Sequence, residues 1–398
     1  MTTPLPFGTW PSPISPERIV EGAATPTEVW AADGHVWWSE SRPSEGGRIQ
    51  VVTLVDGEAV DLLPEGFNAR TRVHEYGGGA WWVDGMTVYF ANWSDQRLYR
   101  VEAGADPVAV TPGPSVPAGW RYADGRVAPG GETIICVRED HSAGGEATNE
   151  IVAFSTTGSD AATVLVSGRD FVSSPRISAD GTRLAWIAWD HPNMPWDDTE
   201  LWVADLTLTG GSATISNASR VAGGDAESVM QPEWAPNGTL YVISDRSDWW
   251  NVYRVADDGD LVNVLPLDHE VGLPAWIFGR PAYGIADDGS VVLTYSSDGL
   301  ARLACVKPDG SSETRVLDRL SLGSLRIDGS TVAAIATSVD REPEIVSITT
   351  GDEFGEVVLR PARELGIDAS TFSTPEHITF PSGEGRVAHA WFYPCLLY

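Results

Sequence analysis

The sequence contains few cysteines and no long hydrophobic run. Three cysteines among 398 residues are too few for the disulfide framework that supports small secreted domains. Cys136 and Cys305 lie in apolar, strand-like segments, which predicts buried thiols, and Cys395 lies near the end of the sequence. No apolar run reaches the ~18 residues that a membrane span requires. The opening MTTPLPFGTWPSPIS lacks the basic and apolar segments of a secretion signal, so we expect a cytoplasmic protein.

Basic residues are also scarce, because 26 lysines and arginines face 56 aspartates and glutamates, a formal net charge of -30. Such a surface repels phosphate backbones and anionic lipid headgroups, so we expect neither a nucleic acid nor a membrane partner. The charge suits cationic ligands or a saline environment. Simple solubility is the interpretation that we favour.

Catalytic and metal-binding motifs are missing as well. The sequence has no Gly-x-Ser-x-Gly, HExxH, CxxC or EF-hand loop, and its seven histidines show no ligand spacing. Asp197 and Asp198, with Asp190 nearby, could hold a cation, but carboxylates in loops are usually just solvated. Gly77, Gly78 and Gly79 follow no strand-to-helix pattern, so they predict no phosphate site. We expect no catalytic residue, no metal and no cofactor in this chain.

What the sequence does contain is a repeat, in which a turn of the Asp-Gly type is followed by an apolar strand. Examples are AADGHVWWSES, SADGTRLAWIAW and ADDGSVVLTYS. Asp-Gly and Asn-Gly supply the positive φ angles of tight hairpin turns, so each copy predicts two paired strands. Successive turn glycines are 51, 46, 50, 57, 51 and 40 residues apart. They are Gly34, Gly85, Gly131, Gly181, Gly238, Gly289 and Gly329.

A second hairpin follows in each unit, as in NVYRVADDGDLVNVLPL. Four strands in each period of ~40 to 50 residues are typical of a β-propeller blade. The sequence therefore predicts an all-β, seven-bladed β-propeller of four-stranded antiparallel blades, with six or eight blades as alternatives. The only helical pattern is PARELGIDAS at 361–370, and we expect Pro175, Pro232 and Pro281 at the beginnings of strands.

Three segments resemble the propeller of bacterial prolyl oligopeptidase-family serine peptidases, in the branch of dipeptidyl aminopeptidases and acylaminoacyl peptidases. They are RTRVHEYGGGAW (70–81), WDHPNMPWDDTELWVADL (189–206) and QPEWAPNGTLYVISDRSDWWNVYR (231–254). The opening PFGTWPSPIS and the late PEHITFPSGEGRVAHAWFYP are similar to the same branch. The resemblance runs from about residue 7 to Pro394.

In this family a propeller covers a C-terminal α/β-hydrolase domain that carries a Ser-Asp-His triad. The resemblance implies a lead segment at 1–27, a propeller at 28–366, and a linker with the short start of the hydrolase domain at 367–398. Because the sequence continues only to CLLY, we expect a truncated product or fragment that is inactive alone. Its expected partners are the missing hydrolase domain and, in the complete enzyme, a short peptide.

Two segments contain more charged, aromatic and hydrogen-bonding side chains than the packing of a blade requires. The first is Arg72, His74, Glu75 and Tyr76, which either offers charge to a peptide or forms a buried Arg–Glu pair and a histidine that lock two blades. The second is a long loop that is either a substrate-facing lid or interface plug, or a self-packed loop around two tryptophans. We treat both as candidates for substrate gating; the second comprises Trp189, Asp190, His191, Asn193, Trp196 and Asp197.

The resemblance predicts a gating function, in which the propeller admits only short peptides to the hydrolase. The acidic charge favours substrates with a free amino terminus, which fits an aminopeptidase better than an acylaminoacyl peptidase. A stand-alone interaction module is the alternative, and residues 375–394 discriminate between the two because they would close or cap a true module. A lactonase or glycan-acting propeller enzyme is a third possibility, but no convergent set of carboxylates or metal ligands supports it.

Overall fold

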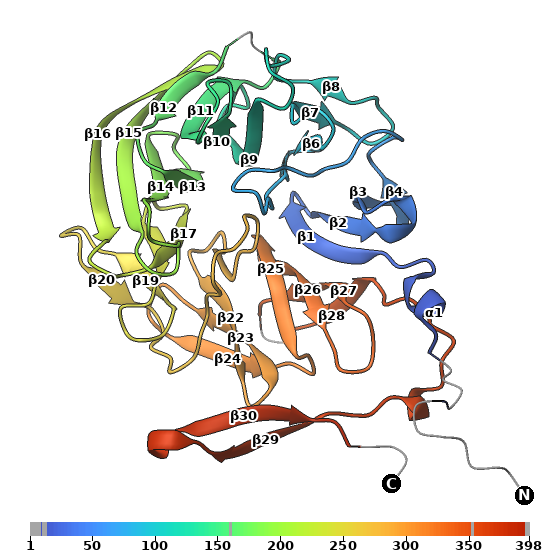
Figure 1. The fold of residues 1–398 in the computed structure, drawn as a ribbon. Coiled ribbons are helices and arrows are strands. Elements are labelled where there is room, and N and C mark those ends of the chain that lie inside the picture. The colour runs from blue at the N-terminus through green and yellow to red at the C-terminus, as the bar shows by residue number, and fades with distance from the viewer. Residues whose placement is uncertain (1–8, 10–13, 159–160, 352–353, 395–398) are drawn as a thin grey trace, which may run out of the picture.

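Every Asp-Gly-type turn joins the first two strands of a four-stranded antiparallel sheet, and seven such sheets form the ring in Figure 1. All seven turn glycines have a left-handed backbone, with φ between +54° and +84°, as tight hairpin turns require. The predicted seven-bladed β-propeller is confirmed. The structure is a computed structural model that describes residue 9 and residues 14–158, 161–351 and 354–394. Cys395 and most of the opening PFGTWPSPIS therefore lie outside the described residues.

The blades follow one another along the chain, and each is a continuous segment whose strands pair in sequence order. Blade 1 comprises β1 (Thr25–Ala32), β2 (His35–Arg42), β3 (Arg48–Val55) and β4 (Glu58–Asp61), and blade 2 comprises β5 (Trp81–Asp84), β6 (Thr87–Ala91), β7 (Leu98–Val101) and β8 (Val108–Ala109). Blade 3 comprises β9 (Trp120–Val127), β10 (Thr133–Asp140), β11 (Thr148–Ser155) and β12 (Thr163–Val166). Blade 4 comprises β13 (Phe171–Ile177), β14 (Arg183–Trp189), β15 (Glu200–Thr209) and β16 (Ser212–Gly223).

Blade 5 comprises β17 (Val229–Trp234), β18 (Leu240–Ser244), β19 (Asn251–Val255) and β20 (Leu261–Asn263). Blade 6 comprises β21 (Tyr283–Ile285), β22 (Val291–Ser297), β23 (Leu300–Val306) and β24 (Ser312–Val316). Blade 7 comprises β25 (Ser321–Asp328), β26 (Thr331–Thr337), β27 (Glu344–Thr349) and β28 (Glu356–Arg360). The remaining elements are α1 (Pro16–Val20), the short 3-10 turns Pro43–Glu45, Ala369–Thr371 and Gly383–Gly385, and the hairpin strands β29 (Glu376–Pro381) and β30 (Val387–Phe392). In the described residues no helix is long and apolar enough to cross a membrane.

The first strand of each blade lines the axis of the ring, because each contacts the first strands of both neighbouring blades. The Asp-Gly turns then lie at one end of the blades, which we call the turn face. The connections between blades, and the turns between second and third strands, lie at the other end, which we call the loop face. Both faces of a blade pack against neighbours, so strands such as β10 are buried over nearly their whole length.

Two local predictions were wrong. Pro175 and Pro232 lie inside β13 and β17, at bulges where the pairing shifts register. A bulge leaves a residue unpaired, so the missing proline N–H costs little there as well. The segment 361–370 forms no α-helix, because Gly366 adopts a left-handed backbone (φ +59°) that ends any helical run. The α-helix is instead α1, where Ser15 accepts a hydrogen bond from the main-chain N–H of Arg18.

Seven hydrophobic clusters fill the seven interfaces between blades in the described residues. The cluster between blades 3 and 4 has fourteen buried members, whereas the one between blades 7 and 1 has only five. No strand is shared between the first and last blades to close the ring. This closing seam therefore has the smallest apolar contact of the seven and needs polar contacts in addition.

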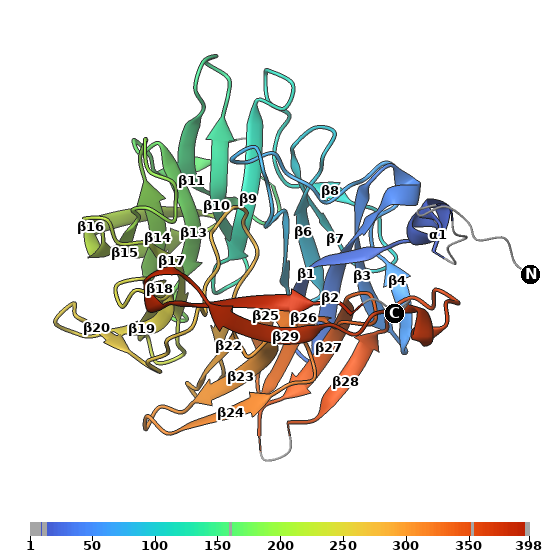
Figure 2. The same ribbon diagram turned by 60° about the horizontal axis from the view of Figure 1, so that its bottom comes forward.

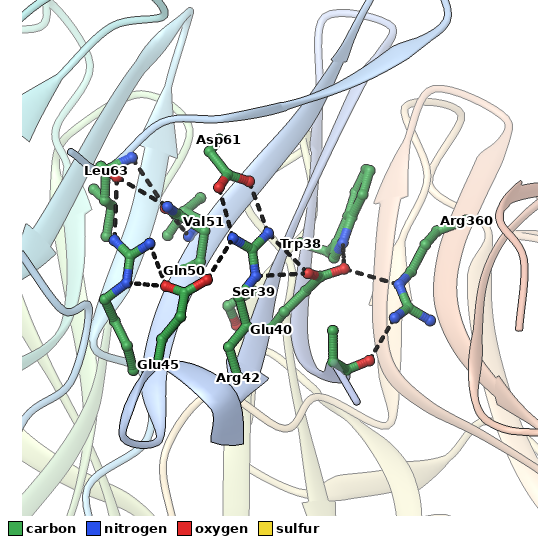
Figure 3. Close-up of polar contacts among 12 residues, drawn as sticks. Trp38, Ser39, Glu40, Arg42, Glu45, Gln50, Val51, Asp61, Leu63 and Arg360 are labelled. Carbon is green, nitrogen blue, oxygen red and sulfur yellow. Dashed lines mark hydrogen bonds and ion pairs between the residues drawn. The ribbon is translucent and has the colours of Figure 1, made fainter. Parts of the chain in front are cut away.

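Polar side chains supply the rest of the closing seam (Figure 3). Glu40, buried on β2, accepts hydrogen bonds from Trp38 Nε1 at 2.9 Å and from Arg360 Nε, across the seam, at 2.8 Å. Arg42 binds its other oxygen at 3.1 Å and Asp61 at 2.6 Å. Burial opposes ionisation of Glu40, but the hydrogen bonds from Trp38 and Arg360 outweigh it and hold its pKa below the ordinary value. Glu40 is therefore the charged centre of the seam.

Removing the charge that crosses the seam destabilises the ring. We expect Arg360→Met to lower the free energy of unfolding by about 2–4 kcal/mol, because buried charged hydrogen bonds are lost. Arg220→Met removes a more exposed pair with Glu200 and should cost less than about 1 kcal/mol. Urea unfolding of both variants measures the difference. Equal losses would contradict a special role for the seam.

Candidate functional site

Two long connections extend over the middle of the loop face. One joins blades 1 and 2 through residues 62–80, and the other joins blades 5 and 6 through residues 264–282. Figure 1 shows both reaching inward from the blades to the centre of the ring. They meet in an isolated parallel bridge between Gly78 and Phe278, where the Phe278 N–H donates to Gly77 O at 3.1 Å. The two connections thus cover the axis from opposite sides.

The backbone of the first connection is strongly constrained at this point. His74 and Glu75 have φ of +52° and +62°, and Gly77, Gly78 and Gly79 have φ of +73°, +83° and +55°. A β-carbon on Gly78 would lie 2.3 Å from Phe278 O. Only glycine permits this approach, and non-glycine residues in left-handed conformations persist where the surroundings hold them. The HEYGGG sequence is therefore the element that builds the crossing.

His74 is the buried anchor of this connection. Its ring contacts Phe278 (4.8 Å between centroids), Phe171 (5.2 Å) and Trp189 (5.5 Å). Burial lowers its pKa to about 4, so the imidazole is neutral at physiological pH. Its main-chain N–H donates to Glu139 Oε1 at 2.6 Å. His74 therefore anchors the connection between blades 1 and 2 to blades 3 and 4.

The neighbours of His74 do not form the predicted Arg–Glu pair. Arg72 lies over the ring of Trp93 at 4.2 Å, in a cation–π contact. Glu75 instead pairs with Arg121 at 3.1 Å, and its side chain is 80% exposed. Tyr76 is also exposed. Glu75 and Tyr76 are therefore the members of this segment that face solvent.

The second candidate segment is divided between core and surface. Trp189 is buried and stacks on Phe171 at 5.2 Å, and His191 contacts the same ring at 5.0 Å. Asp190 binds Arg169 at 2.8 Å. The remaining members lie in the loop that follows: the Asn193 N–H donates to Asp190 O, Asp197 Oδ2 accepts from the Met194 N–H, and Trp196 extends to the connection between blades 5 and 6.

Trp276, which the sequence did not single out, brings the two segments together. Its ring lies 5.7 Å from Tyr76 and 4.3 Å from Trp196. Tyr76 is 66% exposed and Trp276 is 51% exposed. We call Tyr76, Trp196 and Trp276 the aromatic cluster. The available sequence signal was the strand-free length of 264–282, since long connections carry function more often than short ones.

Beneath the crossing, the first strands bring buried charges to the axis. Glu28 on β1 accepts from the Gly79 N–H at 3.0 Å. Burial raises the Glu28 pKa to about 8, although Arg326 acts in the opposite direction. Asp124 on β9 binds Arg176 on β13 at 3.1 Å. Within the described residues no group of three or more His, Cys, Asp or Glu side chains is arranged to hold a metal ion.

The hairpin β29–β30 lies outside the ring, next to blades 6 and 7, and pairs with no blade strand (Figures 1 and 2). It approaches the turn between β22 and β23, where a β-carbon on Gly299 would lie 2.5 Å from the Trp391 ring. That turn lies at the loop-face end of blade 6. The hairpin therefore contacts the same end of the blades that carries the aromatic cluster.

The comparisons with known proteins agree with this architecture. The family model of the lipoprotein LpqB β-propeller domain matches residues 83–314, more than half of the chain. The chain belongs to this β-propeller family. No curated protein matches the sequence.

Solved structures extend the likeness over nearly the whole propeller. A puromycin-hydrolyzing peptidase of Mycobacterium tuberculosis is 35% identical, with a TM-score of 0.88, over 98% of this chain and 61% of its own. A puromycin hydrolase is 29% identical, with a TM-score of 0.89, over 99% and 62%. A prolyl endopeptidase structure, 13% identical with a TM-score of 0.65, shares the fold. The resemblance to a propeller of the prolyl oligopeptidase family is confirmed, and the chain spans about three fifths of the two puromycin-cleaving relatives.

The close packing of Gly78 against Phe278, where the two connections cross, can be tested by substitution. We expect Gly78→Ala to destabilise the protein by about 1–3 kcal/mol more than Gly238→Ala. Both glycines have φ +83°, but Gly238 has nothing within 4 Å of its added β-carbon, so the control contains only the left-handed strain. Urea unfolding followed by tryptophan fluorescence measures both. Equal costs would show that Gly78 and Phe278 do not pack as described.

Proposed function

We propose that this chain is the substrate-gating propeller of a serine peptidase of the prolyl oligopeptidase family that acts on short peptides. The observation that carries the proposal is the 35% identity, over 98% of the chain, to a puromycin-hydrolyzing peptidase that is longer by about the size of a catalytic domain. An α/β-hydrolase domain in the complete enzyme would transfer the acyl group of a peptide to serine and then to water. The chain itself, which has no Gly-x-Ser-x-Gly, would bind and select.

The hairpin β29–β30 supports a hydrolase partner. Ile378, Phe380 and Phe392 are 39%, 47% and 50% exposed, and the strand register places them on one face with Ala388 and Ala390, and with Glu376 at its end. A two-stranded sheet with an apolar exposed face is marginal by itself. In a stand-alone module we would expect these residues to pair with a blade and close the ring, whereas β29 and β30 pair only with each other. We assign the hairpin to the sheet of the hydrolase domain.

The gate would consist of the two connections on the loop face. Their crossing at Gly78 and Phe278 would narrow access along the axis, and the aromatic cluster would offer apolar contact to a substrate side chain. Glu75 is 80% exposed on the constrained connection, although it pairs with Arg121 at 3.1 Å, and it would attract a positively charged amino terminus. The negative net charge of the chain also attracts a positively charged amino terminus over a longer range. The proposed substrate is therefore a short peptide with a free amine.

Peptide binding tests the gate with the chain as it exists. The probe is a tetrapeptide amide with a free amino terminus and an aromatic first residue, and its binding is followed by quenching of tryptophan fluorescence. We expect its dissociation constant to be at least tenfold lower than that of the N-acetylated form. Glu75→Gln should remove most of this preference. Glu65→Gln, an exposed carboxylate of the same connection, is the matched control and should leave it unchanged.

Equal binding of both peptides, or no binding of either, would contradict the gate. If the two glutamine substitutions had equal effects, the preference for a free amine would come from the overall negative charge and not from a specific contact with Glu75.

A further inference from the structure

A separate cavity of about 330 Å³ opens on the turn face, at the end of the axis opposite the two connections. Its walls are the last residues of β9 and β13 and the turns that follow them, with Asp84, Glu233 and Trp234 from neighbouring blades. The volume is at the lower end of the range for small-molecule sites. None of the gating candidates lines it.

Two guanidinium groups form part of the wall. Arg176 uses Nε for Glu233, at 3.1 Å, and Nη1 for Asp124, at 3.1 Å. Arg126 uses only Nη1, which donates to Gly125 O at 2.7 Å and to Asp124 at 3.3 Å. Among the described residues no acceptor is bonded to Nη2 of either arginine or to Nε of Arg126. The cavity thus has unused donors on fixed, charged side chains.

Positive charge is in excess around these groups. Arg326 has no carboxylate or hydrogen-bond partner in the described residues; its guanidinium lies over Trp30 at 4.2 Å, and Arg126 lies over the same ring at 4.8 Å. Three arginines therefore face two paired carboxylates, Asp124 and Glu233. The third nearby carboxyl, Glu28, has its pKa raised to about 8 by burial.

The pKa values divide the three arginines. Burial opposes the charge of Arg176, but Asp124 and Glu233 outweigh it and raise its pKa. Burial, followed by the charge of Arg176, lowers the pKa of Arg126 to about 9, and burial lowers that of Arg326.

Asp84 and Glu233 are the carboxylates of the lining. Glu233 is paired with Arg176, and the pKa of Asp84 is raised by burial and by Asp33. A ligand with a single negative charge would reduce the repulsion between the arginine side chains, whereas Asp84 would repel a ligand with two negative charges.

We propose that this cavity binds a carboxylate, held by the guanidinium groups of Arg126 and Arg176. Arginine matches the planar, two-oxygen geometry of a carboxylate. The apolar part of the ligand would lie against the side chains of Val127, Ile177 and Trp234 that share the lining. Two sources offer this chemistry, namely the C-terminal carboxylate of a peptide and a free small organic acid.

Calorimetric titration of the full chain tests the proposal with four probes. They are sodium acetate, inorganic phosphate, an N-acetylated tripeptide with an apolar last residue and a free carboxylate, and the C-terminal amide of the same tripeptide. Acetylation removes the amine on which the gate depends, so the result is independent of the gate. We expect the peptide acid to bind at least tenfold more tightly than the amide. Binding of acetate as tight as that of the peptide acid would assign the site to free small acids.

Arg126→Gln should weaken binding of the carboxylate at least tenfold, while Arg126→Lys retains part of it. Asp124 keeps Arg176 as its partner in both variants, so we expect them to fold, and thermal unfolding checks this. Arg183→Gln removes an exposed guanidinium that stacks on Trp234 and should bind as the wild type does. Equal affinity for peptide acid and amide, inorganic phosphate binding more tightly than either acid, or equal losses in Arg126→Gln and Arg183→Gln would overturn the proposal.

Discussion

The contact between the first and last blades determines whether this chain forms a ring at all. Every blade is built from one continuous segment, so in the part of the chain that the structure describes no strand pairs the first blade with the last. The apolar cluster at this seam has five buried members, and the Glu40–Arg360 hydrogen bond at 2.8 Å adds a charged contact. All other features described depend on it, because only a closed ring brings the connections of distant blades to one axis. Conformational entropy opposes closure, and buried polar contacts of this kind are strong only when fully paired.

The two sites proposed above lie at the two ends of that axis. On the loop face, two connections cross at Gly78 and Phe278 and present the aromatic cluster. On the turn face, a cavity is lined by Arg126 and Arg176, which share the carboxylate of Asp124. The propeller fold places both sites on the axis without requiring either, since inward-facing positions need only pack. The left-handed residues of HEYGGG, and Arg326, which has no hydrogen-bond partner among the described residues and lies over Trp30, depart from simple packing.

The sequence predicted the fold well because its signal is local and repeated. Each Asp-Gly turn specifies a hairpin through backbone sterics alone, and seven copies leave little freedom in the architecture. The candidate site was predicted only in part. The HEYGGG segment stood out through its glycines, but Trp276 lies 200 residues further along the chain, and no local pattern relates it to Tyr76. The axial charges were missed for the same reason, because Glu28, Asp124 and Arg326 are ordinary strand residues until the ring closes.

The central claim, that this propeller works as the gate of a serine peptidase, is tested most directly by reading the genomic DNA that follows codon 398 in all three frames. The account predicts a Gly-x-Ser-x-Gly motif on a strand-to-helix segment, followed by the aspartate and histidine of a triad, within about 200–250 codons. An unrelated gene or an intergenic region at that position would contradict it, and a stand-alone propeller with another ligand would then be the better description.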